Sequence, residues 1–450
     1  MSVRDQLNAI AKERIIIMDG AMGSTIQALQ LKEENFRGKR FSSHPAPLKG
    51  CNDLLCLTMP DVISGIHEAY LEAGADIIET CSFNSTSISL ADYGLENLAY
   101  EISAAEASVA RKSADKYSSS GKPRFVAGSI GPTARGASLY PDINDPSRRS
   151  ILWDELEAAY YDNARGLLDG GADILIVETV FDTLNAKAAL FAISRLLKER
   201  NIDVPVMVSA TVSGDLLSST NPSSSSNPSS FSKPRGKLLS GQSLDAFYAS
   251  VRHINPWAVG LNCSLNAEKL KPFVRALSEI ADCYVCACPN AGLPDQLGYY
   301  EETPDNMSAN IEEYFKEGLV NIIGGCCGSA PPHIIEIAKK AASYKPRTLP
   351  TCKYSQHTFF CGLEPLFIQD NTIQFSETAD EFLSLSGRGE YEDAVDAARD
   401  MIDNGETIVN VKTNNKETLS GFLDFALMNP YVAKVPFLLT VLIWKLYRPV

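Results

Sequence analysis

The hydrophobic positions of this chain follow one recurring pattern. An amphipathic helical stretch ends near a glycine, and a short apolar stretch rich in β-branched residues follows it. The pattern occurs at residues 68–80, 163–179, 311–327 and 397–413. Glycine suits a helix end because it enters the left-handed backbone region without a steric cost. Continuously apolar strands are typical of parallel sheets covered by helices, so the pattern predicts an α/β fold.

Eight candidate strands precede the Lys- and Pro-containing stretch near residue 345. They are residues 15–19, 77–80, 125–129, 174–178, 206–211, 258–262, 284–288 and 321–324. Eight strands with helical patterns between them favour a (β/α)₈ TIM barrel. The rival fold, an open doubly wound sheet, normally carries a GxGxxG loop after its first strand, and DGAMGS at 19–24 does not fit that motif.

The length of the chain exceeds what one barrel needs. We assign residues 1–345 to the barrel, 346–360 to a linker and 361–450 to a partial α/β segment, which is too short to close a second barrel. Residues 213–235 are a low-complexity run of Ser, Asn and Pro. Such a composition cannot bury a core, so we predict a surface loop inserted after the fifth strand.

Charge and targeting signals narrow the class of protein. The formal net charge is −14, which argues against nucleic acid or an anionic membrane surface as a partner. No secretory signal and no apolar run long enough to span a bilayer are visible, so we expect a cytoplasmic protein. In that compartment the eleven cysteines point to metal binding or catalysis more than to disulfides.

Polar or reactive side chains stand where the predicted strands end. A barrel carries its chemistry at this C-terminal face. The residues are Asp19, Thr80, Ser129, Glu178, Thr211, Asn262 with Cys263, Asn290, and Cys326 with Cys327. Strands commonly end in polar residues on meeting solvent, but that alternative does not account well for the three cysteines.

The cysteines at two of these strand ends form a candidate metal site. Cys263 follows the sixth strand in GLNCS, and Cys326 and Cys327 follow the eighth in GGCCGS. Three thiolates from neighbouring loops could bind one Zn²⁺ and leave a fourth position open. The alternative is that they are buried thiols acting as small hydrophobes. We interpret Cys283, Cys286 and Cys288 as core thiols, because a redox CxxC normally opens a helix and this one lies within a strand.

Eight ordered motifs carry a resemblance to a known family. They are MDGAMGSTIQ (18–27), ADIIETCSFNST (75–86), GSIGPT (128–133), DILIVETVFDTLNAKAAL (173–190), LSGQ (239–242), GLNCS (260–264), PNAGLP (289–294) and GGCCGS (324–329). Over roughly residues 5–345 the chain resembles the homocysteine-binding module of cobalamin-dependent methionine synthase. Related homocysteine methyltransferases that use betaine or S-methylmethionine share the cysteine triad and the barrel. GLEP at 362–365 resembles the junction into the folate module and favours the first branch.

The resemblance implies a zinc-dependent homocysteine S-methyltransferase of methionine biosynthesis. The methyl donor would be methylcobalamin, carried by another module or protein. The resemblance makes Cys263, Cys326 and Cys327 the zinc ligands, and the homocysteine thiol would take the fourth position. The implied substrate contacts are Asp19, Gly20 and Glu178 near the ammonium and carboxylate groups, Asn290 near the open metal position, and Thr80, Ser129 and Thr211 at matching strand ends.

Two other functions stay open at this point. The first is a homocysteine methyltransferase that takes its methyl group from betaine or S-methylmethionine. The second is a non-catalytic zinc protein or partner-binding subunit, in which Cys283, Cys286 or Cys288 would close a four-cysteine site.

The second segment resembles a degenerate opening of the folate-binding barrel. Its FSETAD stretch at 375–380 lacks the arginine of the family, and Lys412 stands where the family has asparagine. Lysine accepts no hydrogen bond, so contacts to a pterin ring should be lost. The cobalamin-binding motif Asp-x-His-x-x-Gly is also missing from the sequence.

We therefore predict that this chain by itself binds neither methyltetrahydrofolate nor cobalamin. Equilibrium dialysis of the purified chain against each labelled compound measures this directly. Tight binding of either compound at about one molecule per chain would contradict the prediction.

Overall fold

The chain is described here by a computed structural model. The description leaves out residues 139–147, 214–235, 296, 297, 299, 351–357, 369–378, 414, 430, 434, 436 and 441–450. Apart from Ser213, the predicted low-complexity loop lies outside the described residues, as does the middle of the predicted linker.

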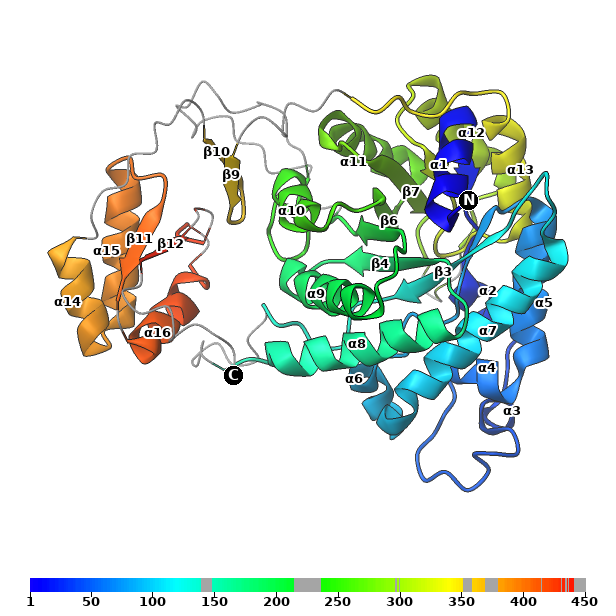
Figure 1. Ribbon diagram of the computed structural model, residues 1–450, viewed down its shortest axis with the longest axis horizontal. Coiled ribbons are helices and arrows are strands. Elements are labelled where there is room, and N and C mark those ends of the chain that lie inside the picture. The colour runs from blue at the N-terminus through cyan, green and yellow to red at the C-terminus, as the bar shows by residue number, and fades with distance from the viewer. Residues whose placement is uncertain are drawn as a thin grey trace.

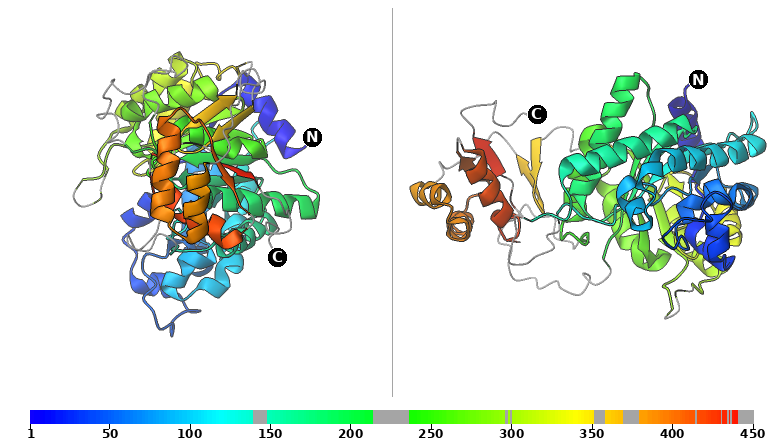
Figure 2. Two further views of the ribbon diagram at one scale, coloured as in Figure 1. Left: turned by 90° about the vertical axis from the view of Figure 1, so that its left-hand side faces the viewer. Right: turned by 90° about the horizontal axis from the view of Figure 1, so that it is seen from below.

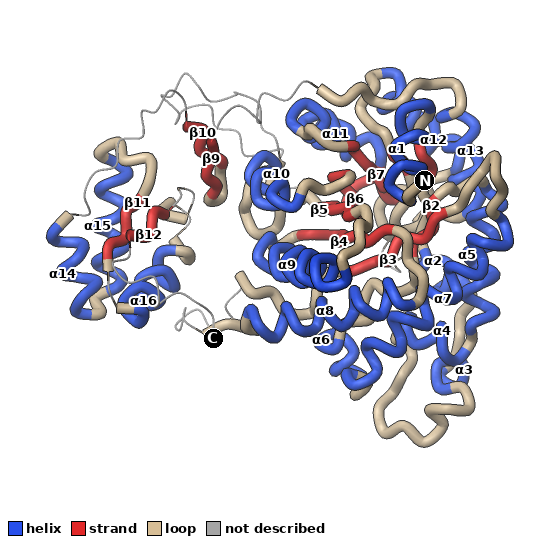
Figure 3. Tube along the Cα trace, in the orientation of Figure 1, coloured by secondary structure: helices blue, strands red, loops and turns tan. Residues whose placement is uncertain are grey.

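Eight parallel strands form a closed barrel (Figures 1 and 3). They are β1 (Ile16–Ile17), β2 (Ile77–Glu79), β3 (Phe125–Ile130), β4 (Ile174–Val180), β5 (Val206–Ala210), β6 (Ala258–Asn266), β7 (Tyr284–Asn290) and β8 (Ile322–Ile323). Each strand pairs with its neighbours in chain order, and β1 pairs with β8. A parallel bridge between Met18 and Ile77 joins β1 to β2 and closes the ring. The predicted TIM barrel is confirmed, and each of the eight predicted strands is present.

Helices surround the barrel strands. They are α1 (Val3–Glu13), α2 (Met22–Ala28), α3 (Glu33–Arg37), α4 (Leu55–Thr58), α5 (Pro60–Ala73), α6 (Ser87–Leu90), α7 (Ala99–Tyr117), α8 (Trp153–Asp169), α9 (Thr183–Arg200), α10 (Leu244–Val251), α11 (Ala267–Ile280), α12 (Pro304–Lys316) and α13 (Pro331–Ala341). Gly74 ends α5 at a φ of +113°, as the glycine in the first repeated pattern predicts. Within the described part of the chain, no helix is both long and apolar enough to cross a bilayer.

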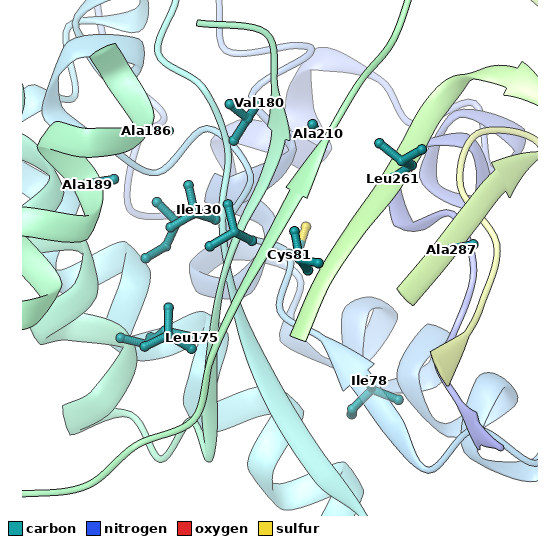
Figure 4. Packing of buried hydrophobic residues seen from close by; sticks show 14 of the residues in the cluster. Ile78, Cys81, Ile130, Leu175, Val180, Ala186, Ala189, Ala210, Leu261 and Ala287 are labelled. Carbon is teal, nitrogen blue, oxygen red and sulfur yellow. The ribbon is translucent and has the colours of Figure 1, made fainter. Parts of the chain in front are cut away.

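The strands are buried on both faces, which explains their continuously apolar sequences. Ile174 and Ile176 of β4 face the barrel interior, whereas Leu175 and Val177 pack against the surrounding helices. Figure 4 shows part of this outer layer, with Val180 of β4 near Ala186 of α9 and Ile130 of β3 near Ala189. Alternate strand residues therefore belong to two apolar layers, one inside the barrel and one beneath the helices. Polar residues appear only where strands end.

Helix α1 closes the end of the barrel at which the strands begin. Its Leu7 and Ala11 belong to the same buried cluster as the interior strand residues. Trp257, just before β6, donates a hydrogen bond from its indole nitrogen to Asn8 Oδ1 at 2.9 Å. The opposite, C-terminal end is left for the functional side chains.

The chain beyond the barrel forms a smaller unit with its own core (Figure 2). The hairpin β9 (Thr358–Cys361) and β10 (Pro365–Ile368) comes first and lies against α10 of the barrel. The unit itself consists of α14 (Asp380–Arg388), α15 (Tyr391–Asp403), β11 (Val409–Lys412), α16 (Lys416–Ala426) and β12 (Phe437–Thr440). Strands β11 and β12 are parallel, and Phe382 packs edge-to-face on Phe422 with 4.7 Å between ring centroids. An α/β segment is therefore present here, whereas its likeness to a folate module stays a prediction.

A glycine in β6 allows the close packing of two barrel strands. A Cβ atom at Gly260 would lie 2.7 Å from the carbonyl oxygen of Cys286 on β7. We predict that Gly260→Ala lowers the free energy of unfolding by about 1–3 kcal/mol, because the strand has no room to yield. Chemical denaturation measures the change.

Gly65 on α5 provides the matched control, since a Cβ atom there would meet no atom within 4 Å. Gly65→Ala should raise stability by up to about 1 kcal/mol through the helix propensity of alanine. Equal effects of the two substitutions would contradict the packing argument.

Candidate metal centre

The structure brings the three predicted cysteines together at the C-terminal end of the barrel. Cys263 lies in β6, and Cys326 and Cys327 follow β8. Their sulfur atoms all lie within 4.8 Å of one another, and those of Cys263 and Cys327 are 3.8 Å apart. Within the described residues, no other group of three His, Cys, Asp or Glu side chains meets this spacing. The arrangement has the geometry of three ligands on one metal ion.

The backbone departs from regular strand geometry to present these sulfurs. Cys263 and Ser264 have φ values of +62° and +59°, in the left-handed region that non-glycine residues seldom adopt. The pairing of β6 with β7 shifts register at this point, between Asn262 and Asn266. On the other side, the Cys326 N–H donates to the Pro289 carbonyl at 2.8 Å, which ties the cysteine pair to the end of β7. Both loops are thus held by the barrel.

The thiols depend on one another for their protonation. Hydrogen bonds to its sulfur from Cys263 and Cys326 lower the pKa of Cys327 to about 3. The same contacts, together with burial, raise the pKa of Cys326 well above its usual range. One thiolate therefore forms readily, and a bound cation is what would let the other two ionise.

Asn290 supplies a second indication of a bound group. It ends β7, it is 2% exposed, and its Oδ1 has no hydrogen-bond partner among the described residues. The next residue, Ala291, donates its N–H to the Cys327 carbonyl at 2.9 Å, so Asn290 lies beside the cysteines. A buried carbonyl oxygen without a partner is unfavourable. The donor set and this unpaired atom both fit a metal site with a further ligand.

Buried carboxyl groups also lie at the mouth of the barrel. Glu178 of β4 accepts a hydrogen bond from the Ser129 hydroxyl on one oxygen and from Asn262 Nδ2, at 3.2 Å, on the other. Burial raises the pKa of Glu178 to about 7 and that of Asp19 well above its usual range. Asp19 Oδ2 accepts the backbone N–H of Glu79 at 2.9 Å.

Glu79, the last residue of β2, is a third member of this group. Burial first, then the charges of Glu178 and Asp19, raise the pKa of Glu79. No ion pair joins any of the three carboxyl groups to a described Lys or Arg side chain. A ligand with a positive charge would complement this part of the site.

The other residues that the sequence predicts to contact substrate mainly contact other residues of the protein. A Cβ at Gly20 would lie 2.8 Å from Ser329 Oγ and 2.9 Å from the Tyr70 ring, so only glycine fits there. Thr80 Oγ1 accepts the Ser129 N–H at 2.9 Å, and the Thr211 and Ser264 hydroxyls are 2.5 Å apart. All of these residues lie at strand ends around the mouth, and their contact with substrate stays a prediction.

Three residues at the site were not assigned roles from the sequence. Glu79 could have been noticed as an acid within the apolar stretch ADIIET, and Asn262 as the residue before Cys263. Tyr300, in the loop after β7, forms a side-chain hydrogen bond with Cys327. Its position in an irregular loop left no periodic signal in the sequence.

The cysteines of β7 do not join the cluster. Cys286 and Cys288 are buried, with 3.8 Å between their sulfurs, and Cys286 also contacts Met18. Cys283 precedes the strand, at its other end. Among the described residues, the closed four-cysteine site of the structural alternative therefore has no fourth thiol.

A parallel barrel with a cysteine cluster that could hold a metal ion, and with buried carboxyl groups at its C-terminal face, has the architecture of a TIM-barrel enzyme. The family model of homocysteine S-methyltransferase matches residues 16–341, and the chain belongs to this family. It is therefore a methyltransferase that acts on homocysteine.

Solved structures of a homocysteine methyltransferase share the fold. The metallated form of MmuM from Escherichia coli matches with a TM-score of 0.54 and 20% sequence identity, covering 75% of this chain and 99% of that one. The oxidized form matches with a TM-score of 0.53 and 20% identity, covering 72% and 96%. At this identity the likeness supports the barrel architecture.

Removal of one sulfur should abolish metal binding at the cluster. We predict that Cys326→Ser lowers the zinc content from about one ion per chain to a small fraction of that, because two thiolates and a hydroxyl are a poor zinc donor set. Elemental analysis after dialysis against trace zinc measures the content.

Cys361→Ser is the control, because Cys361 lies in β9 and directs its sulfur to the Ala246 carbonyl at 3.2 Å. That variant should keep its zinc. Equal zinc content in both variants would contradict the assignment of the cluster.

Proposed function

We propose that this protein is a zinc-dependent homocysteine S-methyltransferase that takes its methyl group from methylcobalamin held by another module or protein. The observation that carries the proposal is the cluster of Cys263, Cys326 and Cys327 at the mouth of the barrel. Membership of the homocysteine S-methyltransferase family and a structurally similar protein with a metallated form both support it.

The donor set suits zinc. Three thiolates bind Zn²⁺ in a tetrahedral site and leave one position for substrate, as catalytic zinc sites do. Zinc held there would keep the homocysteine thiol, whose usual pKa is about 8.5, ionised and nucleophilic at neutral pH. No general base is then needed at the sulfur, which is consistent with a mouth that holds carboxyl groups and no histidine among the predicted contacts.

The amino acid end of homocysteine would lie near the buried carboxyl groups of the protein. Its ammonium group would pair with Glu178 and Asp19, whose raised pKa values reflect burial without a positive partner. The turn at Gly20, where a side chain would collide with Ser329 and Tyr70, lets the substrate approach the backbone closely. Anchoring both ends would aim the sulfur at the donor methyl group. The new S–CH₃ bond forms as the donor's bond to the methyl group breaks, and the donor keeps the electron pair.

Two alternatives remain to be tested. Betaine or S-methylmethionine could supply the methyl group, since enzymes that use them share the barrel and the triad. A structural zinc protein is disfavoured, because no fourth cysteine lies within the cluster in the part of the chain that is described.

An assay with each donor tests the source of the methyl group. Zinc-loaded protein and homocysteine are incubated with methylcobalamin, betaine or S-methylmethionine, and methionine is quantified by mass spectrometry. We predict that methionine forms with methylcobalamin. Turnover with only one of the other donors would contradict the cobalamin part of the proposal and leave homocysteine as the acceptor.

X-ray absorption at the zinc edge tests the catalytic role. We expect three sulfur neighbours at about 2.3 Å in the free protein and four after homocysteine is added. A sulfur count that does not rise with substrate would contradict the catalytic assignment and favour a structural site.

A further inference from the structure

Asn262 is at the centre of the hydrogen bonds that link the two halves of the site. It precedes Cys263 on β6, and its side chain is 4% exposed. Its Oδ1 accepts the Thr179 N–H at 3.0 Å and the Ser209 hydroxyl at 2.8 Å. Its Nδ2 donates to Thr179 Oγ1 at 2.8 Å and to Glu178 Oε2 at 3.2 Å. Both donors and both acceptor positions of the amide are therefore used.

These partners also settle which way the amide points. The backbone N–H of Thr179 can only donate, so the atom that faces it must be the oxygen. The amide nitrogen then necessarily faces the Glu178 carboxyl group. An amide, with one donating and one accepting end, is the side chain that fits this position.

One end of the amide stabilises a strained backbone. Thr179 has a φ of +54°, which is rare for a β-branched residue. The pairing of β4 with β5 shifts register here, between Val177 and Val180. The bulge leaves the Thr179 N–H outside the regular strand pairing, and Asn262 accepts it. Such strain persists only where the surroundings over-determine it.

The other end of the amide holds the carboxyl group that the bulge presents. Glu178 is supported by Ser129 from β3 on one oxygen and by Asn262 from β6 on the other. The next residue after Asn262 is Cys263, where the left-handed backbone begins. One side chain thus joins a cysteine of the cluster to the buried carboxyl group across the barrel mouth.

We propose that Asn262 is a positioning residue that sets the distance between the cysteine cluster and Glu178. The inference rests on the proposed function, in which the substrate sulfur lies at the cluster and its ammonium group at Glu178. A substrate of fixed length needs a fixed separation between these two anchors. Small errors of placement weaken binding and orientation.

The isosteric variant Asn262→Asp tests this inference. It keeps an oxygen for the Thr179 N–H but replaces the donor that faces Glu178 with a second oxygen. We expect the Kd for homocysteine, measured by calorimetry on zinc-loaded protein, to rise about tenfold or more. The zinc content should stay unchanged, and the loss in kcat/KM should lie mainly in KM.

Asn321→Asp is the matched control. Asn321 is also buried, and it accepts the Val285 N–H at 3.0 Å and donates to the Arg347 carbonyl at 2.7 Å, just before β8 begins. This variant should lose stability without a change in the Kd. Equal Kd values for Asn262→Asp and the unsubstituted protein would overturn the inference. Loss of zinc with an unchanged Kd in the metal-loaded fraction would also overturn it.

A double-mutant cycle separates positioning from a general loss of structure. Glu178→Gln alone should weaken homocysteine binding, and Asn262→Asp should then add little, because its effect acts through Glu178. Independent, additive losses in Kd would overturn the inference.

The same measurements distinguish this inference from the proposed function. If the unsubstituted, zinc-loaded protein binds no homocysteine, the proposed function fails. If it binds homocysteine and Asn262→Asp binds equally well, only the role of Asn262 fails.

Discussion

The constraint on which this site depends is the close approach of three thiol groups. Sulfur atoms within 4.8 Å of one another cannot all ionise unless a cation neutralises them. The contacts among the sulfurs lower the pKa of Cys327 and raise that of Cys326. The left-handed backbone at Cys263 and the tie between Cys326 and β7 hold the sulfurs in this arrangement. The protein therefore holds together a set of donor atoms that could bind a metal ion.

The buried carboxyl groups at the mouth have no Lys or Arg partner in the described part of the chain. Burial raises the pKa of Asp19, Glu79 and Glu178, and the charge of Glu178 raises those of Asp19 and Glu79 further. One half of the site thus suits a metal with a bound sulfur, and the other suits an ammonium group. A short amino acid thiol has both groups, which is the basis of the proposed binding of homocysteine in this family member.

The barrel positions these groups with strained backbone conformations, which contacts from neighbouring strands stabilise. Thr179, Cys263 and Ser264 adopt positive φ values at two breaks in strand pairing, one between β4 and β5 and one between β6 and β7. Each break turns a residue of the candidate site, Glu178 or Cys263, out of the regular strand pattern. Asn262 precedes Cys263 and bonds to Thr179 and Glu178, so it connects the two distorted segments. The smaller C-terminal unit buries a separate core and contributes none of these side chains.

The sequence by itself determined the barrel, because apolar strands of fixed spacing and glycine-ended helices are local features. It also determined the reactive strand ends, since a parallel barrel gathers the carboxyl ends of its strands at one face. It could not determine which of those ends touch. Cys263 and Cys326 are 63 positions apart in the sequence, and they lie close together only because β6 and β8 flank β7. Contacts between strands and loops stabilise the left-handed backbone at Thr179 and Cys263. Such contacts also bring Glu79, Asn262 and Tyr300 to the site. Such contacts leave no periodic trace along the chain, and only the tertiary structure decided them.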